Sequence, residues 1–190
     1  MARPRNFDED RAVEAAMRAF WTAGYEATST QDLCAATGLG RSSIYNTFRS
    51  KHDLFERALR RYMEIKDAAT LEALKGEGTF RERIAVLLRG MIEEDCRDGI
   101  GCLVVNSEIE LAPRDPVIAE LLRRNYGRRL EALRAAIEEA QRNGEIDAER
   151  DARGLAHFVI ATISGLRVAA RAGAGREALE AVAETALRAL

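Results

Sequence analysis

The stretch between Ser29 and Asp53 carries two helix-start signals separated by a glycine turn. Ser29 followed three residues later by Asp32 is a Ser-x-x-acid step, in which the side chains satisfy backbone amides that have no partner inside a helix. Gly38 can end that short helix in a left-handed cap, and only two residues then separate it from a second helical run over 41–48. The spacing predicts two short helices joined by a tight turn.

The second of these helices has one apolar face. Ile44 and Phe48 are four residues apart and can pack inward together. The other positions carry donor-rich side chains that point elsewhere: Arg41, Ser42, Ser43, Tyr45, Asn46 and Thr47. Ser50 and Asp53 repeat the capping step and start a third helix. This pattern is typical of a helix-turn-helix that reads DNA, although an αα-corner inside another helical protein has the same outline.

The string from Thr28 to Phe55, TSTQDLCAATGLGRSSIYNTFRSKHDLF, resembles the DNA-binding signature of TetR/AcrR-type one-component transcriptional regulators. Its distinctive part is the aromatic step over 44–48, followed by Ser-Lys at 50–51 and Asp-Leu-Phe at 53–55. The resemblance implies a dimeric, sequence-specific DNA-binding protein. It implies a repressor that a small-molecule effector releases from a palindromic operator in double-stranded DNA.

Composition supports a nearly all-helical, soluble chain. The 190 residues include only three prolines, 47% are apolar and 32% are charged. The net charge of −2 gives no global sign of a nucleic-acid partner, but residues 41–61 hold six basic and two acidic side chains. Such a local basic stripe can bind phosphates.

The cysteines and the hydropathy of the chain exclude several other classes of protein. Three cysteines without Cys-x-x-Cys spacing indicate neither a disulfide framework nor a zinc site, and no cofactor is expected. No apolar stretch reaches membrane length and no signal peptide opens the chain. We therefore expect a cytoplasmic protein without a membrane partner.

Helix signals predict an all-α fold of nine helices. An N-terminal three-helix helix-turn-helix module is expected over residues 1–53, and a six-helix effector-binding and dimerisation core over 54–190. The fourth helix, over 51–75, bridges the two and can act as a lever. The later helices are expected over 79–97, 100–111, 115–143, 148–172 and 176–190.

The N-terminal end is expected to be a short polar arm over 2–6, before a first helix that runs from Asp8 to Gly24. Arg3 and Arg5 give the arm two positive charges. Such an arm can enter a minor groove, as the arms of other helix-turn-helix proteins do. A frayed terminus is an equally good interpretation.

The last two helices, the eighth and ninth, carry the predicted dimer interface. Residues 154–166 contain no charged side chain, and a helix that is apolar on most sides must be covered on most sides. A second copy supplies this cover, with the small residues Gly165, Ala169 and Ala170 at close approach. Two recognition helices related by a two-fold axis then read half-sites about 34–36 Å apart, or a multiple of that distance.

Roles within the reading surface follow from chemistry and from the resemblance. The resemblance implies that Tyr45 and Lys51 bind the DNA backbone, with Thr28 and His52 as weaker candidates, although His52 can equally be an ordinary helix-start residue. Lys51 also lies in the first turn of a helix, where backbone amides favour a phosphate. Arg41 can make a bidentate contact to guanine. The remaining candidates for base or phosphate contacts are Ser42, Ser43, Asn46 and Thr47.

An effector pocket in the larger half is expected mostly from the resemblance. Gly101-Cys102-Leu103 and Asn106 are similar to a subgroup in which a Gly-Cys step opens the sixth helix. Cys102, Asn106 and Glu110 are spaced by four and share one helix face. The other candidate lining residues are Tyr62, Met91, Tyr126, His157, Phe158, Arg167 and Arg171. Stripes of this kind also occur in ordinary cores, and His157 can be a core or interface group.

Two roles for Cys102 stay open. In some members of the subgroup this cysteine senses electrophiles or oxidants, which requires a thiolate favoured by a helix N-terminus and by a cation such as Arg167 or Arg171. A cysteine in this position can also be a small hydrophobic residue. A reversible small-molecule pocket is the main expectation.

An enzyme is the rival class. Cys102 and His157 could form a nucleophile and base, but the sequence supplies no orienting third group. Gly-x-Gly steps occur at 38–40, 76–78, 99–101 and 173–175, and none continues to the third glycine of a dinucleotide loop. A helical adaptor without DNA binding is a third class, which the intact donor set over 41–47 argues against. We expect a regulator and not an enzyme.

Overall fold

The computed structural model describes residues 9–190, and within that range the chain forms nine α-helices. They are α1 (Glu9–Ala23), α2 (Thr30–Thr37), α3 (Arg41–Phe48), α4 (Lys51–Leu74), α5 (Phe80–Asp98), α6 (Leu103–Glu110), α7 (Pro116–Arg142), α8 (Ala152–Arg171) and α9 (Arg176–Ala189). The predicted all-α fold, with a helix-turn-helix module before a helical core, is confirmed. The arm over 2–6, with Arg3 and Arg5, and the predicted helix start at Asp8 lie outside the described residues.

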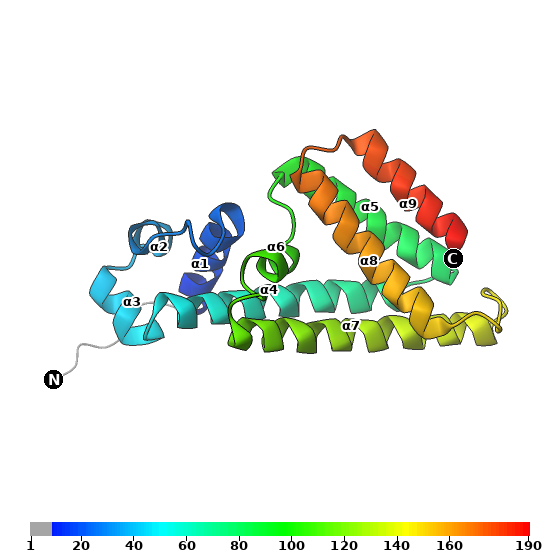
Figure 1. The fold of residues 1–190 in the computed structure, drawn as a ribbon, viewed down its shortest axis with the longest axis horizontal. Coiled ribbons are helices and arrows are strands. Elements are labelled where there is room, and N and C mark those ends of the chain that lie inside the picture. The colour runs from blue at the N-terminus through cyan, green and yellow to red at the C-terminus, as the bar shows by residue number, and fades with distance from the viewer. Residues whose placement is uncertain (1–8) are drawn as a thin grey trace.

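The molecule is elongated, with α1, α2 and α3 at one end and α8 and α9 towards the other (Figure 1). We call α1 to α3 and the first turns of α4 the head, and the remainder the core. The 24-residue helix α4 runs from the head into the core, where it packs against α7. Leu54, Phe55 and Leu59 join the apolar cluster of the head, whereas Leu74 belongs to a second cluster in the core. One continuous helix therefore contributes side chains to both apolar clusters.

The head is held together by apolar side chains from all four of its helices. Phe20, Leu33, Ile44, Phe48 and Phe55 are each 1% exposed or less, and the rings of Phe20 and Phe55 meet edge to face at 5.0 Å. Complete burial of a large apolar side chain contributes about 1.5–3 kcal/mol. This cluster fixes short helices that would not be stable alone.

The predicted caps around the glycine turn are present. The Ser29 hydroxyl accepts the Asp32 amide, and the Asp32 carboxylate accepts the Ser29 amide and hydroxyl. The hydrogen bonds from the Ser29 side chain and backbone hold the pKa of Asp32 below its ordinary value. Gly38 closes α2 at φ +70° by donating its amide hydrogen to the Cys34 carbonyl. The turn between α2 and α3 therefore follows from local chemistry.

The sixth helix starts later than its sequence pattern indicates. The prediction began it at Ile100, but α6 begins at Leu103. Gly99 and Gly101 both adopt left-handed conformations, with φ of +65° and +70°, and a right-handed helix cannot contain them. Cys102 is consequently the N-cap residue of α6, and does not lie within the helix.

The eighth helix also starts later than predicted. Asp151 is its N-cap, because the Asp151 carboxylate accepts the amides of Arg153 and Gly154. This cap places the first residue at Ala152, four positions after the expected start at Ala148. Across residues 9–190, no helix is both long enough and apolar enough to cross a membrane.

Candidate DNA-reading surface and ligand cavity

Helix α3 presents polar side chains above a buried apolar base. Ile44 and Phe48 are 1% and 0% exposed, so they anchor the helix in the head. The six donor-rich side chains are all exposed or half-buried, as their positions predict: Arg41, Ser42, Ser43, Tyr45, Asn46 and Thr47. The structure thus brings this predicted set together on one short helix at the end of the molecule (Figure 1).

Tyr45 connects α3 to the start of α2. Its hydroxyl is hydrogen-bonded to the Thr30 hydroxyl at 3.0 Å. The Arg41 guanidinium lies 5.8 Å from the centre of the same ring, within the range of a cation–π contact. These contacts restrict the orientations of Tyr45 and Arg41 before any partner binds.

Lys51 begins α4 immediately after the Ser50 cap, whose hydroxyl accepts the Asp53 amide. The Lys51 ammonium lies 4.5 Å from the centre of the Tyr25 ring and donates to the Glu26 carbonyl at 3.4 Å. The free amides of the first helical turn add a positive potential at the same place. This combination suits a phosphate.

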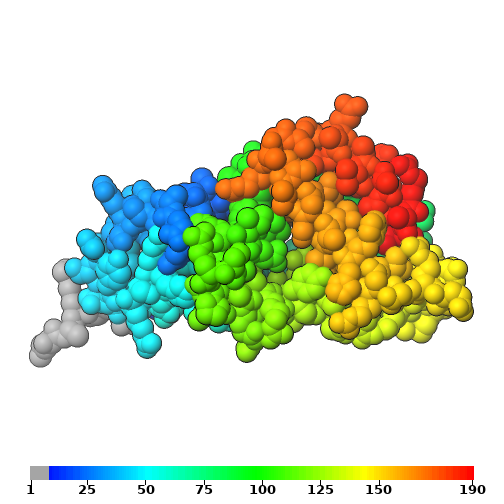
Figure 2. All heavy atoms as spheres, in the orientation of Figure 1, coloured from blue at the N-terminus to red at the C-terminus, as the bar shows by residue number. Residues whose placement is uncertain are grey.

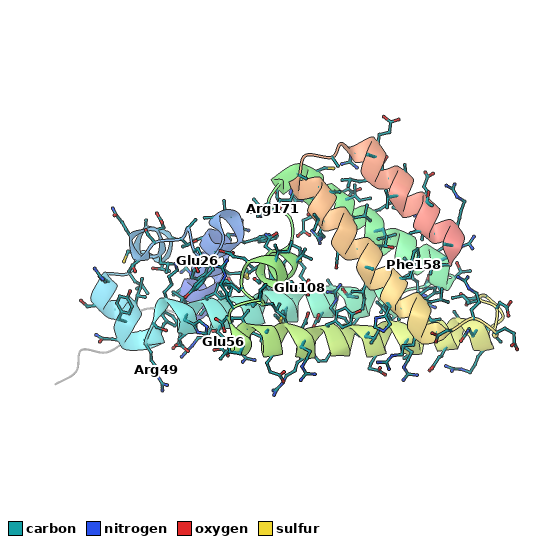
Figure 3. The ribbon with its side chains drawn as sticks, in the orientation of Figure 1. Glu26, Arg49, Glu56, Glu108, Phe158 and Arg171 are labelled. Carbon is teal, nitrogen blue, oxygen red and sulfur yellow. The ribbon has the colours of Figure 1, made fainter. Side chains whose placement is uncertain are left out.

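Arg49 is a candidate that the sequence interpretation did not single out. It follows α3 at φ +55° and ψ −44°, and it is the one residue other than glycine with positive φ among residues 9–190. Its side chain is exposed and projects away from the molecule (Figure 3). Strained backbone of this kind often marks a functional position. Its charge, in the basic stripe just before the Ser50 cap, was the available signal.

Two weaker DNA-contact candidates have other partners. Thr28 is 1% exposed, and its hydroxyl donates to the Gly24 carbonyl at 2.6 Å. No hydroxyl surface is left for a phosphate, so we drop Thr28 from the DNA-contact set. His52 is paired with Asp115 across 2.7 Å, from Nε2 to Oδ2. That contact ties the start of α4 to the cap of α7, so we interpret His52 as a link between head and core.

A cavity of about 420 Å³ lies in the core between α4, α5, α7 and α8. Much of its wall is apolar, and includes Met63, Ala69, Val86, Leu87 and Ile163. Polar groups such as Thr70 and Asn125 are placed among them. Of the predicted pocket residues, four line this cavity: Tyr62, Met91, Cys102 and Arg167. Pockets that are mostly apolar with a few polar groups are typical of small-molecule sites.

The other six predicted pocket residues do not line this cavity. Asn106 and Glu110 instead bind backbone groups of Ile100 and of Tyr25 and Glu26. With Arg171 they border a separate hollow between the end of α1, α6 and the end of α8. Tyr126 and His157 are hydrogen-bonded at 2.6 Å where α7 meets α8. Phe158 borders a third hollow between α8 and α9.

An ion-pair network forms the polar wall of the cavity. Arg167 donates to Asp95 at 2.5 Å and to Glu94 at 2.9 Å, and Lys66 also pairs with Glu94. Burial raises the pKa of Asp95 above its ordinary value despite the nearby Arg167 guanidinium. Burial acts in the same direction on Glu94, but hydrogen bonds and charge from Lys66 and Arg167 bring the pKa of Glu94 below its ordinary value. We therefore interpret Arg167 as a structural residue that neutralises Glu94 and Asp95, more than as a ligand contact.

The Tyr62 hydroxyl donates to the Cys102 sulfur at 3.5 Å on the same cavity wall. Burial and the adjacent Cys102 raise the pKa of Tyr62, so the hydroxyl keeps its proton. The thiol is half-buried at the N-cap of α6. No group of three His, Cys, Asp or Glu side chains within residues 9–190 is arranged to hold a metal ion.

A helix-turn-helix head joined by one helix to a helical core that contains a cavity defines a DNA-binding protein with a separate regulatory core. Residues 12–58 match the family described as "Bacterial regulatory proteins, tetR family", and residues 81–186 match "Tetracyclin repressor-like, C-terminal domain". The chain belongs to the TetR family of transcriptional regulators. It is a DNA-binding regulator and not an enzyme.

Similar proteins cover nearly the whole chain. The HTH-type transcriptional repressor ComR of Escherichia coli (strain K12) is 34% identical over 98% of this chain and 90% of its own length. The repressor DhaR of Mycobacterium sp. (strain GP1) is 27% identical over 88% of this chain and 84% of its own. A cysteine mutant of the TetR family regulator CifR, solved in complex with 26-base-pair operator DNA, is 34% identical, covers 99% of both chains and has a TM-score of 0.88.

Proposed function

We propose that two copies of this chain occupy a palindromic operator as a repressor, and that a small molecule in the core cavity releases them. The observation that carries the proposal is the exposed donor set of α3, fixed above buried Ile44 and Phe48 and followed at once by Lys51. The similar repressors and the operator complex of CifR support the same function. The division into a reading module to residue 53 and a regulatory core from 54 belongs to this proposal.

Phosphate contacts position the protein, whereas base contacts specify sequence. We assign Tyr45, Lys51 and the strained Arg49 to phosphates. Arg41 is assigned to guanine, because a guanidinium can bind that base with two hydrogen bonds. The other exposed side chains of α3 complete the set: Ser42, Ser43, Asn46 and Thr47.

Removing a proposed phosphate contact is expected to affect DNA binding differently from removing a proposed base contact. Lys51→Ala should weaken binding to all duplexes and lower the slope of log affinity against log salt by about two per dimer, one for each protomer. Arg41→Ala should instead reduce discrimination at the contacted base pair by about 1–3 kcal/mol. Gel shifts with operator variants over a salt series measure both quantities.

Lys75→Ala is the matched control, because Lys75 is an exposed lysine at the far end of α4. It should bind DNA like the wild type. If both Lys51→Ala and Arg41→Ala bound DNA like the wild type, the proposed DNA contacts of α3 and Lys51 would be wrong.

An uncovered apolar stripe on α8 supports dimerisation through α8 and α9. Phe158 and Val168 are 39% and 45% exposed, and with Ala161 and Gly165 they recur at spacings of three and four along one face. Val182 of α9 is 51% exposed beside Phe158 in a shared hollow. Ala169 and Ala170 pack against the chain's own core, so of the three predicted small residues only Gly165 belongs to the exposed stripe.

Filling the cavity is the test of effector release. Gly90 lines the cavity, and a Cβ built on it meets nothing within 4 Å. Gly90→Phe should therefore occupy the effector volume without disturbing the head. We expect operator binding to persist while release by compounds found in a thermal-shift screen is lost. Gly90→Ala is the control, and release from Gly90→Phe at wild-type concentrations would contradict this site.

A thiol-based sensor is the second candidate function, favoured by the position of Cys102 on the cavity wall against the Tyr62 hydroxyl. If Cys102 is the sensor, Cys102→Ser should abolish operator release by hypochlorite or a quinone. Cys96→Ser provides the control, since Cys96 is exposed and free. Release that survives Cys102→Ser would leave the reversible pocket as the mechanism.

A further inference from the structure

Two backbone amides of the head are bound by a carboxylate from the core. After α1 ends at Ala23, the chain turns at Gly24 with φ +88°. The next two amides, of Tyr25 and Glu26, donate to the two oxygens of Glu110 at 3.1 and 2.9 Å. Consecutive amides that converge on one anion form a cradle in which hydrogen bonds to charge are stronger than neutral ones.

The cradle fits the carboxylate closely. A Cβ at Gly24 would lie 3.1 Å from Glu110 Oε2, which is tight, and the positive φ independently favours glycine. The Thr28 hydroxyl fixes the far side of the turn by donating to the Gly24 carbonyl at 2.6 Å. The position of the Tyr25–Glu26 segment therefore depends on the position of the Glu110 carboxylate.

The same segment holds Lys51. The Lys51 ammonium lies over the Tyr25 ring and donates to the Glu26 carbonyl, so both of its described contacts come from the two residues bound by Glu110. The Tyr25 ring also packs against Phe55 of α4, with centroids 4.9 Å apart. A shift of the cradle would therefore move the Tyr25 ring and the Glu26 carbonyl, which are the groups that Lys51 contacts.

Helix α6 connects this cradle to the cavity. Glu110 is the last residue of α6, and Cys102 at its other end lines the cavity. The eight residues of α6 span about 12 Å at the usual helical rise. The surface of α6 lies beside that of the end of α1 (Figure 2), and Glu26 lies near this junction (Figure 3). The loop before α6 is also tied to α1, because Trp21 donates to the Gly101 carbonyl at 2.8 Å.

We propose that Glu110 is a positioning residue for DNA binding: through the Tyr25 and Glu26 amides it holds Lys51 where it meets a phosphate. This role rests on the proposed phosphate contact of Lys51. It acts alongside the lever α4 and by a separate route, from α6 through the backbone of the head. The operator affinity should therefore depend on a carboxylate that does not touch DNA.

A double-mutant cycle with Lys51 tests this role. Glu110→Ala should lower operator affinity about threefold to tenfold and should lower the salt slope in the same direction as Lys51→Ala. In the Lys51→Ala background, Glu110→Ala should change affinity less than about twofold, because the group it positions is absent. Glu110→Gln keeps one acceptor and should fall between the wild type and Glu110→Ala.

Glu108→Ala is the matched control, since Glu108 lies on the same helix and its side chain makes no hydrogen bond within residues 9–190. It should bind like the wild type. Additive effects of Glu110→Ala and Lys51→Ala, with an unchanged salt slope for Glu110→Ala, would overturn the positioning role alone. Wild-type binding by Lys51→Ala would overturn the phosphate contact and the positioning role together.

Discussion

Phe158→Asp is expected to abolish tight binding to a two-half-site operator while leaving the protomer folded. Phe158 is 39% exposed in one protomer, so an aspartate can be solvated there. In a dimer through α8 and α9, however, the carboxylate would be buried in an apolar contact without a partner. Loss of the linked second head should lower operator affinity by a factor of about 10²–10⁴.

Analytical ultracentrifugation and gel shifts measure the two parts of this result. The variant should sediment as a monomer at micromolar concentration and keep the wild-type circular dichroism spectrum. Leu71→Asp is the matched control, because Leu71 is 43% exposed on α4, away from α8 and α9. If the Phe158→Asp protein stayed dimeric and bound the operator normally, the dimer interface would have to lie on another surface.

Arg167→Met is expected to destabilise the fold by about 3–5 kcal/mol at neutral pH. The Arg167 and Asp95 side chains are only 9% and 2% exposed, and Asp95 Oδ2 already has no hydrogen-bond partner. Removing the guanidinium leaves the Asp95 carboxylate buried without a cation. Urea unfolding gives the free energy of unfolding for both proteins.

The loss should shrink as the pH falls. A carboxyl whose pKa is higher in the folded state contributes stability below its unfolded pKa, and that contribution is lost as the pH rises through the folded pKa. Burial already raises the pKa of Asp95, and removing Arg167 raises it further. The difference between wild type and variant should therefore be largest near pH 7 and smaller towards about pH 4, the ordinary pKa of aspartate.

Two further variants separate the buried charge from simple packing. Asp95→Ala combined with Arg167→Met should be more stable than Arg167→Met alone, because no buried carboxylate is left unpaired. Arg124→Met removes an exposed pair with Glu120 and should cost less than about 1 kcal/mol. An Arg167→Met protein with wild-type stability at every pH would show that the ion-pair network is not structural.

Local signals predicted most of the fold. The caps at Ser29 and Thr79 and the Asp115-Pro116 helix start all occur as expected, because a cap depends on residues within one turn. The start of α6 was misplaced because the pattern from Ile100 is helical, whereas Gly101 adopts a left-handed conformation packed against Arg171 of α8. The Gly101 carbonyl accepts from Trp21, a contact that no local pattern reveals.

In the candidate site, too, features set by local sequence could be predicted and contacts between distant residues could not. The outward polar set of α3 follows from a helical repeat anchored by Ile44 and Phe48, so it could be predicted. The partners of His52 and Glu110 could not, because they lie 63 and 84–85 residues away along the chain. The charge of Arg49 placed it in the basic stripe, but the positive φ that distinguishes it from the other basic residues there leaves no mark in composition or spacing.

Hydroxyl-radical footprinting of the wild-type protein on the DNA that flanks its own gene tests the central claim most directly. We predict two protected stretches with two-fold symmetry, centred about 34–36 Å apart or a multiple of that distance, which Phe158→Asp loses together. No protected site, or a single unpaired stretch at saturating protein, would contradict a dimer that reads DNA through α3.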